Sequence, residues 1–483
     1  MKTALLHKTG FTVLLLCLCT SCSKLLDETP KSAVTENFYN TPAEVEAAVN
    51  AIFTPLRSTN MSVYEATLEC QSDYANGRGS WAPLHEFQGL NDANITRVSG
   101  LWNAFYLAIR NANLVTGNAP NGNAISKTDA DRFIAEAKFM RAFCYFQLVR
   151  NWGGVPLRTE ENIKQVDLKK STAEEVYNFI LSDLDAAETS LPEKPSSVGR
   201  PSKWAAKTLL ADVYLQLGKY AEARDKADEV IKSNQFSMVP ITSKSDFQNK
   251  VAGPELLSTS EEIFYLKYMR QAGQGNYMLW ITNHPNTKLF NFGGSYVLYG
   301  DETSEFFSSW DSNDLRKALW DKLDIGLGAH TLISSRYTDT KAASKEGAGN
   351  DDPVYSYADA LLIYAEASCR AGNAPTAAGM EALNQVRRRA YGKAPGMPSE
   401  TDLQLADYNA ATFTGRVLQE RAYEFQISGK RWLDLKRSGT AKAVILAATG
   451  KTIAEKHYLW PIPLSEMNYN KALDPAKDQN PGY

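Results

Sequence analysis

The sequence predicts a mainly α-helical fold in which tetratricopeptide-like helix pairs form a scaffold that carries a loop-rich insertion. Three observations predict it. Apolar residues recur with the 3.6-residue period of a helix in two blocks, near residues 42–233 and 355–437. One stretch of the first block has the offsets of a tetratricopeptide helix pair. The residues between the blocks, 238–354, are rich in Gly, Ser, Asn and aromatic residues and lack sustained helical periodicity.

We divide the 483 residues accordingly. A chain of this length has ample material for a large hydrophobic core. We expect a signal peptide of the lipoprotein type, an N-terminal helical part, an irregular insertion and a C-terminal helical part, the last three packed as one globular body. The boundaries are 1–21, 22–237, 238–354 and 355–483.

The first predicted element is an export signal. Lys2, His7 and Lys8 precede an apolar run from Phe11 to Cys19, which is too short to span a bilayer but has the length of a signal-peptide core. The sequence Cys-Thr-Ser-Cys at 19–22 is similar to a bacterial lipobox, although Cys19 stands where that pattern usually has Leu. We therefore expect lipidation of Cys22 and a mature protein held at a membrane surface without crossing it.

Six helices are predicted in the N-terminal helical part. Two of them begin at recognisable signals. Thr41-Pro42 places a capping residue before a proline, and Ser171-Thr172-Ala173-Glu174 has the composition of a capping box. The predicted ranges are 42–57, 100–117, 128–150, 171–191, 202–217 and 219–233.

The helix predicted over 128–150 holds a dense group of aromatic residues, which could form either a ligand platform or core. Three Phe share one side at helical spacing, and Met, Cys and Leu share the neighbouring side. These are Phe139, Phe143 and Phe146, and Met140, Cys144 and Leu148. An apolar arc this wide is typical of a helix buried between others, so we interpret the aromatics as core. Gly153-Gly154 followed by Pro156 is expected to end the helix.

The last two helices of this part have the pattern of a tetratricopeptide hairpin. Small Ala residues at the crossing let the helices approach, and Gly218 permits the tight turn. The matching positions are Leu210, Ala211, Tyr214, Gly218, Tyr220 and Ala223. Residues 357–389 repeat the pattern more loosely, with Gly372 at the turn. Because such pairs cannot bury their apolar faces alone, we expect several to stack into a right-handed scaffold.

The C-terminal part is predicted to hold three helices, over 355–371, 375–391 and 411–437. Ala374-Pro375 marks one start. Residues 429–437 carry many charges but alternate them with apolar residues, so we interpret them as the end of an ordinary amphipathic helix rather than as a site. Pro461-Ile462-Pro463 and the last five residues are expected to tie the C-terminus back onto the core.

Several function classes find no support in the sequence. The formal charge is −3 and no Lys/Arg run is longer than the three Arg at 387–389, so nucleic acid is not an expected partner. The five His are scattered without metal-ligand spacing, and no Gly-x-Ser-x-Gly elbow occurs. The Gly-Lys-Thr at 450–452 lacks the first glycine of a phosphate loop, because Ile445 occupies that position. We expect no catalytic residue, metal or cofactor.

Three cysteines follow the lipobox, and an odd number cannot all pair. Two of them lie in strongly helical patterns. We expect Cys70, Cys144 and Cys369 to behave as small buried hydrophobic residues rather than as disulfide partners.

Residues 133–157, FIAEAKFMRAFCYFQLVRNWGGVPL, resemble the most characteristic segment of the SusD/RagB family of Bacteroidetes outer-membrane lipoproteins. Other segments are similar to that family's motifs and occur in the family's order, so that the resemblance runs from the lipobox to the last residue. They are SEEIFYLKY (260–268), YADALLIYAEA (357–367), LNQVRRRA (383–390), VLQERAYEFQISGKRWLDLKR (417–437), HYLWPIPLSEMNYN (457–470) and QNPGY (479–483).

The resemblance implies a fold, a place and a role. The fold would be a SusD-like α/α superhelix that supports a loop-rich ligand face. The protein would be lipid-anchored in the outer membrane and exposed at the cell surface. It would cap a SusC-like TonB-dependent transporter and capture oligosaccharide or polysaccharide without catalysis. Some members of the family handle peptides or other nutrients instead, and that alternative stays open.

Carbohydrate capture requires exposed aromatic faces together with planar polar groups that hydrogen-bond sugar hydroxyls. Two irregular segments offer that chemistry, residues 72–81 and the insertion, where Asn283 and Tyr299 also lie among Gly and Ser. Family members vary greatly in these segments, so the resemblance transfers no individual residue. We predict as ligand-binding residues Asp73, Asn76, Arg78, Trp81, Trp280, Tyr296 and Trp310. Alternatively, Trp81 or Trp310 anchors a loop onto the scaffold and Arg78 is merely solvated.

Two other classes of function remain open at this point. A glycoside hydrolase needs only two well-placed carboxylates, and the chain has 55 acidic residues. A helical scaffold that binds only protein is the other, although the Trp residues of the insertion argue against it.

Overall fold

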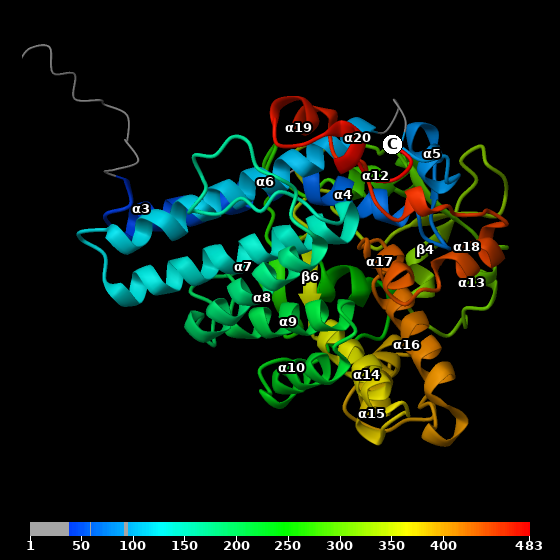
Figure 1. Cartoon of the computed structure of the whole chain (residues 1–483). Helices are drawn as coiled ribbons and strands as arrows, with labels where there is room; N and C mark the ends of the chain where they lie inside the picture. The colour runs from blue at the N-terminus through cyan, green and yellow to red at the C-terminus, as the bar shows by residue number, and fades with distance from the viewer. Residues whose placement is uncertain (1–37, 58, 91–94) are drawn as a thin grey trace, which may run out of the picture.

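Helices make up most of residues 38–57, 59–90 and 95–483, the part of the chain that the computed structural model describes (Figure 1). The mainly α-helical class is therefore confirmed. Cys22 and the predicted signal peptide lie outside these residues. Within the described ranges, no helix is both long and apolar enough to cross a membrane.

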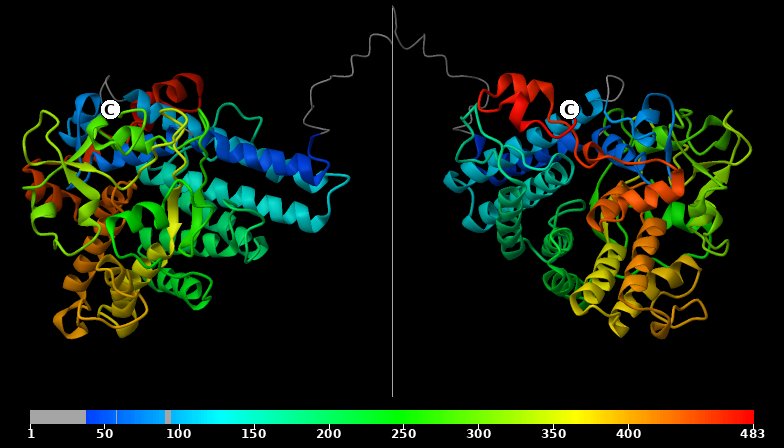
Figure 2. Two further views of the ribbon diagram at one scale, coloured as in Figure 1. Left: turned by 180° about the vertical axis from the view of Figure 1, so that it is seen from behind. Right: turned by 45° about the vertical axis from the view of Figure 1, so that its right-hand side comes forward.

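The N-terminal helices lie side by side, with α6 against both α3 and α7, and with α7, α8 and α9 in succession. Seen from behind in Figure 2, the blue and cyan helices project at one end of the molecule and the strands and loops of the insertion gather at the other. The helices are α3 (Pro42–Phe53), α4 (Asn60–Glu69), α5 (Ala82–His85), α6 (Ile95–Asn118), α7 (Lys127–Trp152), α8 (Ala173–Ser190), α9 (Lys203–Gln216) and α10 (Tyr220–Lys232).

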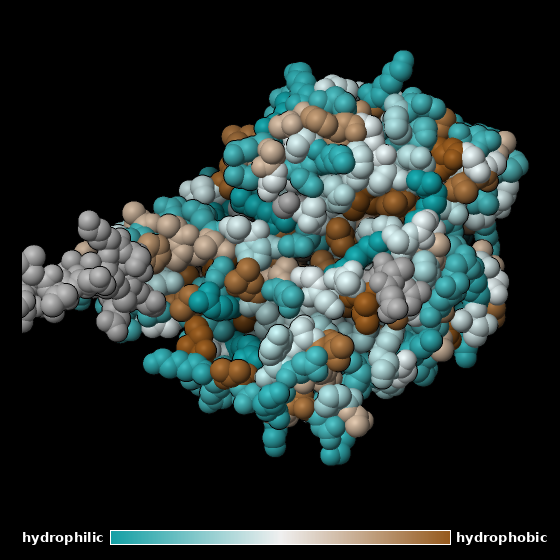
Figure 3. All heavy atoms as spheres, turned by 90° about the horizontal axis from the view of Figure 1, so that it is seen from above, coloured by the Kyte–Doolittle hydropathy of each residue, from teal (hydrophilic) through white to brown (hydrophobic). Residues whose placement is uncertain are grey.

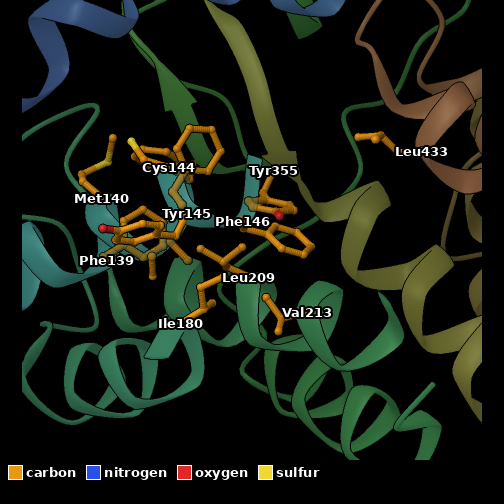
Figure 4. Packing of buried hydrophobic residues seen from close by; sticks show 14 of the residues in the cluster. Phe139, Met140, Cys144, Tyr145, Phe146, Ile180, Leu209, Val213, Tyr355 and Leu433 are labelled. Atoms are coloured by element: carbon orange, nitrogen blue, oxygen red, sulfur yellow. The ribbon is translucent and has the colours of Figure 1, made fainter. Parts of the chain in front are cut away.

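The aromatic residues of α7 form the centre of the core. Phe139, Phe143 and Phe146 are each at most 1% exposed. Figure 4 shows α7 side chains packed with Ile180 of α8 and Leu209 of α9. The interpretation of this stretch as core rather than as a ligand platform is thus confirmed. Gly153 caps the helix with φ of 72°, a backbone conformation that favours glycine.

The predicted helix pairs stack on one another. Gly218, with φ of 71°, makes the turn between α9 and α10, and α10 packs directly on α14 (Tyr357–Gly372). Small side chains fill this contact: Ala211, Ala223, Ala227 and Ala367, with Leu215 and Ile363. α14 in turn packs on α15 (Ala377–Ala390). The two pairs therefore bury each other's apolar faces, as the repeat pattern predicted.

The capping box of α8 is one residue further along than predicted. Thr172 is the N-cap, its Oγ1 accepts from the backbone N–H of Glu175 at 3.2 Å, and Glu175 Oε2 accepts from the backbone N–H of Thr172 at 2.7 Å. We expect Thr172→Ala to lower the free energy of unfolding by about 1 kcal/mol, because a helix N–H loses its acceptor.

Urea unfolding followed by circular dichroism measures this change. Thr189→Ala is the matched control, since the Thr189 hydroxyl near the other end of α8 donates to the carbonyl of Asp185 and caps no helix start. Equal losses of stability in the two variants would contradict the capping role.

The prediction of a single helix over 411–437 is wrong. The structure has two helices there, α16 (Ala410–Glu424) and α17 (Lys430–Arg437). Between them Ile427 and Gly429 have positive φ, 57° and 69°. A side chain at Gly429 would meet the backbone of Glu65 in α4 at 2.9 Å. The close passage of α4 thus requires glycine here and breaks the helix. Helices α18 (Ala441–Thr449), α19 (Leu464–Tyr469) and α20 (Pro475–Asp478) follow.

Most charges of α17 are buried, unlike those of the ordinary amphipathic end that was predicted. The side chains of Asp434 and Arg437 are about one-twentieth exposed, and Arg437 pairs with both Asp434 and Glu366 of α14.

The C-terminal segment is attached to the core, as predicted. Trp152 donates to the carbonyl of Pro461 at 3.0 Å, and Asn480 donates to the carbonyl of Trp152 at 2.8 Å.

The insertion consists of short strands, short helices and loops, as predicted. One antiparallel sheet has the strand order β1-β3-β5-β4, and a second pairs β2 with β6. The strands are β1 (Asn76–Gly77), β2 (Glu262–Leu266), β3 (Leu298–Asp301), β4 (Trp320–Lys322), β5 (Thr331–Ser334) and β6 (Asp352–Ser356). The helices are α11 (Lys244–Asp246), α12 (Met278–Thr282) and α13 (Glu305–Ser308).

The three cysteines of the described residues are free and fully buried. Burial raises the pKa of Cys144 and of Cys70 well above the usual range of a thiol. The expectation that they act as small hydrophobic residues is confirmed.

Candidate functional site

Strand pairing brings the two predicted loop segments together. Asn76 in β1 lies opposite Tyr299 in β3, and Gly77 lies opposite Leu298. The backbone N–H of Arg78 then donates to the carbonyl of Val297 at 2.8 Å. Segments more than 200 residues apart therefore form one surface beside α5 and α12, at the upper right of Figure 1. We call the aromatic face the set Asn76, Arg78, Trp280, His284, Tyr296 and Tyr299.

Arg78 and Tyr296 form the centre of the aromatic face. The guanidinium carbon of Arg78 lies 3.9 Å from the centre of the Tyr296 ring. Arg78 also donates to two backbone carbonyls, from Nη2 to Ser295 at 3.0 Å and from Nε to Tyr296 at 3.3 Å. These contacts fix a planar cation against an aromatic ring, with both side chains partly exposed.

Tyr296 also packs against His284, with ring centres 4.5 Å apart and the rings tilted by 63°. Burial, and then the charge of Arg78, lowers the pKa of His284. Neutral imidazole is therefore favoured beside the guanidinium. Tyr296 has φ of 38°, an uncommon conformation for a residue with a bulky side chain. Such backbone strain persists where surrounding contacts impose it, and it clusters at binding sites.

Trp280 is the middle residue of α12 and is partly exposed, with the Lys345 ammonium 4.5 Å from its ring centre. Its carbonyl accepts hydrogen bonds from the backbone and the hydroxyl of Ser295. The segment carrying Tyr296 is thereby attached to the helix that carries Trp280. Gly294 is required at this crossing, because a side chain there would collide with the carbonyl of Asn283 at 1.9 Å.

Asn283 itself is buried and structural, since its amide bonds to the carbonyl of Gly293 and to the hydroxyl of Thr287.

Three of the predicted site residues do not lie on the aromatic face. Asp73 is 8% exposed and forms two hydrogen bonds with Arg431, at 2.8 and 2.6 Å. Trp310 is 2% exposed, stacks on Tyr423 at 4.1 Å and donates to Asp314. The expectation that these two side chains are free to contact a ligand is wrong, because each is committed to an internal partner.

Trp81 is the third, at 8% exposed, with the guanidinium of Arg97 4.3 Å from its ring centre. Arg97 also donates to the Ser80 carbonyl, so Trp81 fixes its loop on the scaffold. This is the alternative that the sequence left open.

Sequence reasoning missed His284 and Lys345. The first has a weak signal, since it follows Asn283 directly in the insertion. The second has none, because nothing in the sequence places Lys345 over Trp280. Asn76, Arg78, Trp280 and Tyr296 are the predicted residues that the structure brings together.

All six side chains of the aromatic face are partly exposed. Seen from above in Figure 3, apolar side chains lie in separate patches among polar ones. A more enclosed crevice lies elsewhere, between α4, α7 and α17, lined by charged groups such as Glu65, Arg150 and Lys430. Its volume of about 50 Å³ is far below the roughly 300 Å³ at which small-molecule sites begin. Of this crevice and the aromatic face, only the aromatic face is a candidate ligand site.

Glu69 joins the end of α4 to the segment between α16 and α17. It ends α4, is fully buried, and its Oε1 accepts from the backbone N–H groups of Ser428 and Gly429 at 3.0 and 2.7 Å. Burial raises its pKa to about 7, although hydrogen bonds from Tyr74 and the backbone oppose the shift. Folded Glu69 thus keeps a proton that the unfolded chain loses near pH 4.5.

Stability should therefore fall as the pH rises from about 5 to 7. The folded state binds one more proton than the unfolded state in that window, which gives a slope of roughly −1.4 kcal/mol per pH unit for this residue. We expect Glu69→Gln to remove this contribution, as measured by urea unfolding at pH 5, 6, 7 and 8. Glu305→Gln, at an exposed carboxylate of α13, should leave the slope unchanged. If the free energy of unfolding depends on pH equally in Glu69→Gln and in the unmodified protein, Glu69 is not the residue with the raised pKa.

Comparison with known proteins identifies relatives along the whole chain. A family model described as starch-binding associating with outer membrane matches residues 24–215, and a model described as SusD family matches residues 286–483. SusD-like protein P2 of Formosa agariphila is 27% identical, covering 99% of each chain.

Among solved structures, a SusD homolog from Bacteroides thetaiotaomicron has a TM-score of 0.79 at 22% identity, covering 95% of this chain and 100% of that one. Surface glycan-binding protein A from the same organism, in complex with laminarihexaose, has a TM-score of 0.74 at 19% identity, covering 90% and 98%. At these identities the structures establish the shared fold.

Proposed function

The chain belongs to the SusD/RagB family, and we propose that it is a non-catalytic lipoprotein that binds oligosaccharide or polysaccharide and delivers it to a SusC-like TonB-dependent transporter. Lipidation at Cys22 would anchor it in the outer membrane, with the aromatic face directed to the ligand. One anchored partner raises the effective concentration of the other, so a modest affinity between binder and transporter suffices.

The observation that carries the proposal is the fixed stack of Arg78 and Tyr296 beside Trp280. Aromatic rings offer flat apolar surfaces for the C–H side of a sugar ring, and the guanidinium offers planar donors for adjacent hydroxyls. Arg78 is held by two backbone carbonyls and by the Tyr296 ring before a ligand arrives, which lowers the entropic cost of binding. The family description of starch binding supports the same ligand class.

Binding and hydrolysis can be separated in one experiment. The mature protein is run in native gels cast with starch, laminarin or other polysaccharides, and the same mixtures are assayed for new reducing ends. Retardation in at least one gel without release of reducing ends is the expected result. Release of reducing ends would contradict the proposal and indicate that the protein is a glycoside hydrolase.

A peptide or another nutrient is the alternative ligand within the same role. The aromatic face alone does not discriminate strongly against peptides, since Arg and aromatic side chains also bind peptide carbonyls. Titration calorimetry with casein peptides and with hexasaccharides distinguishes the two. Binding heat with the peptides but not with the hexasaccharides would indicate that the ligand is a peptide.

A further inference from the structure

A groove along α6 shares no residue with the aromatic face. It is lined by α6, by residues 158–163 of the loop after α7, and by α19, near the top of Figure 1. Its volume is about 370 Å³, above the roughly 300 Å³ at which small-molecule sites begin. We call it the α6 groove.

The walls of the α6 groove expose apolar side chains to solvent. Leu107 on α6 is 47% exposed, and Ile163 on the opposite wall is 38% exposed. Trp102 and the partly exposed Tyr106 lie between them in the lining. Exposed apolar side chains that gather in one place are typical of an interaction surface. We therefore expect an occupant that brings apolar side chains of its own.

The lining of the α6 groove also carries an unbalanced positive charge. Its carboxylate, Glu466, pairs with Arg158 at 3.3 Å. Its third charged residue, Arg110, is exposed and forms no ion pair within the described residues. An occupant with carboxylates next to apolar side chains would complement both features of the groove.

The described part of the chain begins beside one end of the α6 groove. The carbonyl of Asn40 accepts a hydrogen bond at 2.9 Å from the segment that follows α6. Arg110 lies eight residues before the end of α6, which is about 12 Å along the helix. Leu107 and then Asn103 lie further along. Arg110 is also close to Tyr39, because its charge opposes the rise that burial causes in the pKa of Tyr39.

The segment before the described residues carries side chains in an order that matches the α6 groove. Residues 24–28 are Lys-Leu-Leu-Asp-Glu. Followed back from the start of α3, the chain reaches the two acids first and the two leucines next. The groove, followed from the same end, presents Arg110 first and Leu107 next. Residues 28–37 can extend over roughly 33 Å, which is more than the distance to Arg110.

We propose that Leu25 and Leu26 bind in the α6 groove, with Asp27 and Glu28 beside Arg110. The occupant of the groove is thus the N-terminal segment of the same chain. Burial of the leucines and the opposite charges both favour this contact. Because the segment and the groove belong to one chain, the effective concentration is high and modest contacts suffice.

Binding of this segment would shorten the tether between the lipid and the folded body. Residues 22–37 can extend over roughly 55 Å, whereas residues 22–24 alone span roughly 10 Å. The surface formed by α6 and α19 would then be held close to the membrane. This consequence rests on the proposed lipidation of Cys22, whereas the contact in the groove does not.

Disulfide trapping tests the contact. The mature protein is produced without lipid as Cys22→Ser, and Ser23→Cys is combined with Asn103→Cys, an exposed position of the groove. The matched control combines Ser23→Cys with Ala47→Cys, which is exposed on α3 outside the groove. We expect the groove pair to form its disulfide at least about tenfold faster than the control pair, because binding concentrates residue 23 at the groove. The three native thiols are fully buried and do not compete.

Further variants of the groove pair identify the side chains that hold the segment. Leu25→Ser with Leu26→Ser should slow trapping to the rate of the control pair. Arg110→Glu should also slow it, and addition of Asp27→Lys and Glu28→Lys to Arg110→Glu should restore the rate. Arg110 is exposed, so its replacement leaves the core intact, and the melting temperature of each variant checks the fold.

The outcomes distinguish this contact from other uses of the groove. Equal trapping rates in the groove pair and the control pair overturn the proposal, as does fast trapping that persists after both leucines are replaced. A disulfide between two molecules, seen as a dimer in gels, overturns it in favour of contact between copies of the chain. Trapping in the lipid-free protein is independent of polysaccharide retention in native gels, so either proposal can fail while the other stands.

Discussion

Replacement of both Trp280 and Tyr296 by alanine should lower the affinity for the glycan at least about 30-fold. The few residues that dominate a binding interface are enriched in Trp, Tyr and Arg and contribute roughly 2 kcal/mol or more each, and 2 kcal/mol corresponds to about 30-fold in Kd. Loss of the Tyr296 ring also removes the surface against which Arg78 is fixed at 3.9 Å. Titration calorimetry with the polysaccharide that is retained best in native gels measures the change.

The matched control is Tyr469→Ala. Tyr469 is 79% exposed on α19 and does not belong to the aromatic face, so its loss should change the affinity less than twofold. The melting temperature of each variant, measured without ligand, separates loss of binding from loss of fold. Full affinity in the double variant, with its fold intact, would show that the ligand binds elsewhere on the molecule.

Much of the scaffold can be predicted from sequence because it depends on local patterns. The spacing of the residues around Gly218 predicts the helix pair α9–α10, and the wide apolar arc of α7 predicts that this helix is buried. The break between α16 and α17 cannot be found in this way. It exists because α4, more than 350 residues earlier in the chain, passes within 2.9 Å of the position that a Gly429 side chain would occupy. That constraint is a property of the tertiary structure.

The candidate site likewise has features that local sequence predicts and features that only the tertiary structure determines. Residue type and loop setting are enough to suggest Arg78 and Tyr296, but their contact depends on the pairing of β1 with β3. Pairing between strands so distant in sequence leaves no local trace. Trp310 has the same composition around it, yet it is buried on Tyr423. Aromatic residues among Gly and Ser therefore indicate an irregular region, whereas their exposure is decided by packing.

Replacement of Arg316 by methionine should destabilise the protein by roughly 3–5 kcal/mol, the cost of removing one partner of a buried ion pair. The Arg316 side chain is completely buried. Its guanidinium pairs with Asp314 at 2.6 Å, with Glu420 at 2.5 Å and with Glu424 at 3.0 Å. Methionine fills a similar volume but leaves Asp314 without its cation, and it leaves Glu420 and Glu424 with one arginine each, Arg416 and Arg389. The midpoint of unfolding in urea measures the loss.

Lys322→Met is the control, because Lys322 forms an exposed pair with Glu302 and such pairs contribute at most about 1 kcal/mol. A second variant, Arg316→Met with Asp314→Asn, removes the carboxylate that loses its only cation and should recover part of the stability lost in Arg316→Met. If Arg316→Met and Lys322→Met lower the free energy of unfolding equally, the ion-pair network around Arg316 does not stabilise the fold.

The loss in Arg316→Met should also be greatest at the insertion. Arg316 lies in the insertion, while Glu420 and Glu424 lie in α16, and Glu424 pairs in turn with Arg389 of α15. This network joins the irregular part to the helical scaffold. Limited proteolysis should therefore cleave Arg316→Met within 238–354 before it cleaves the helices, since local opening precedes global unfolding where the joining contacts are weakened. Cleavage that begins in α7 or α14 would instead mean that the network stabilises the scaffold and the insertion alike.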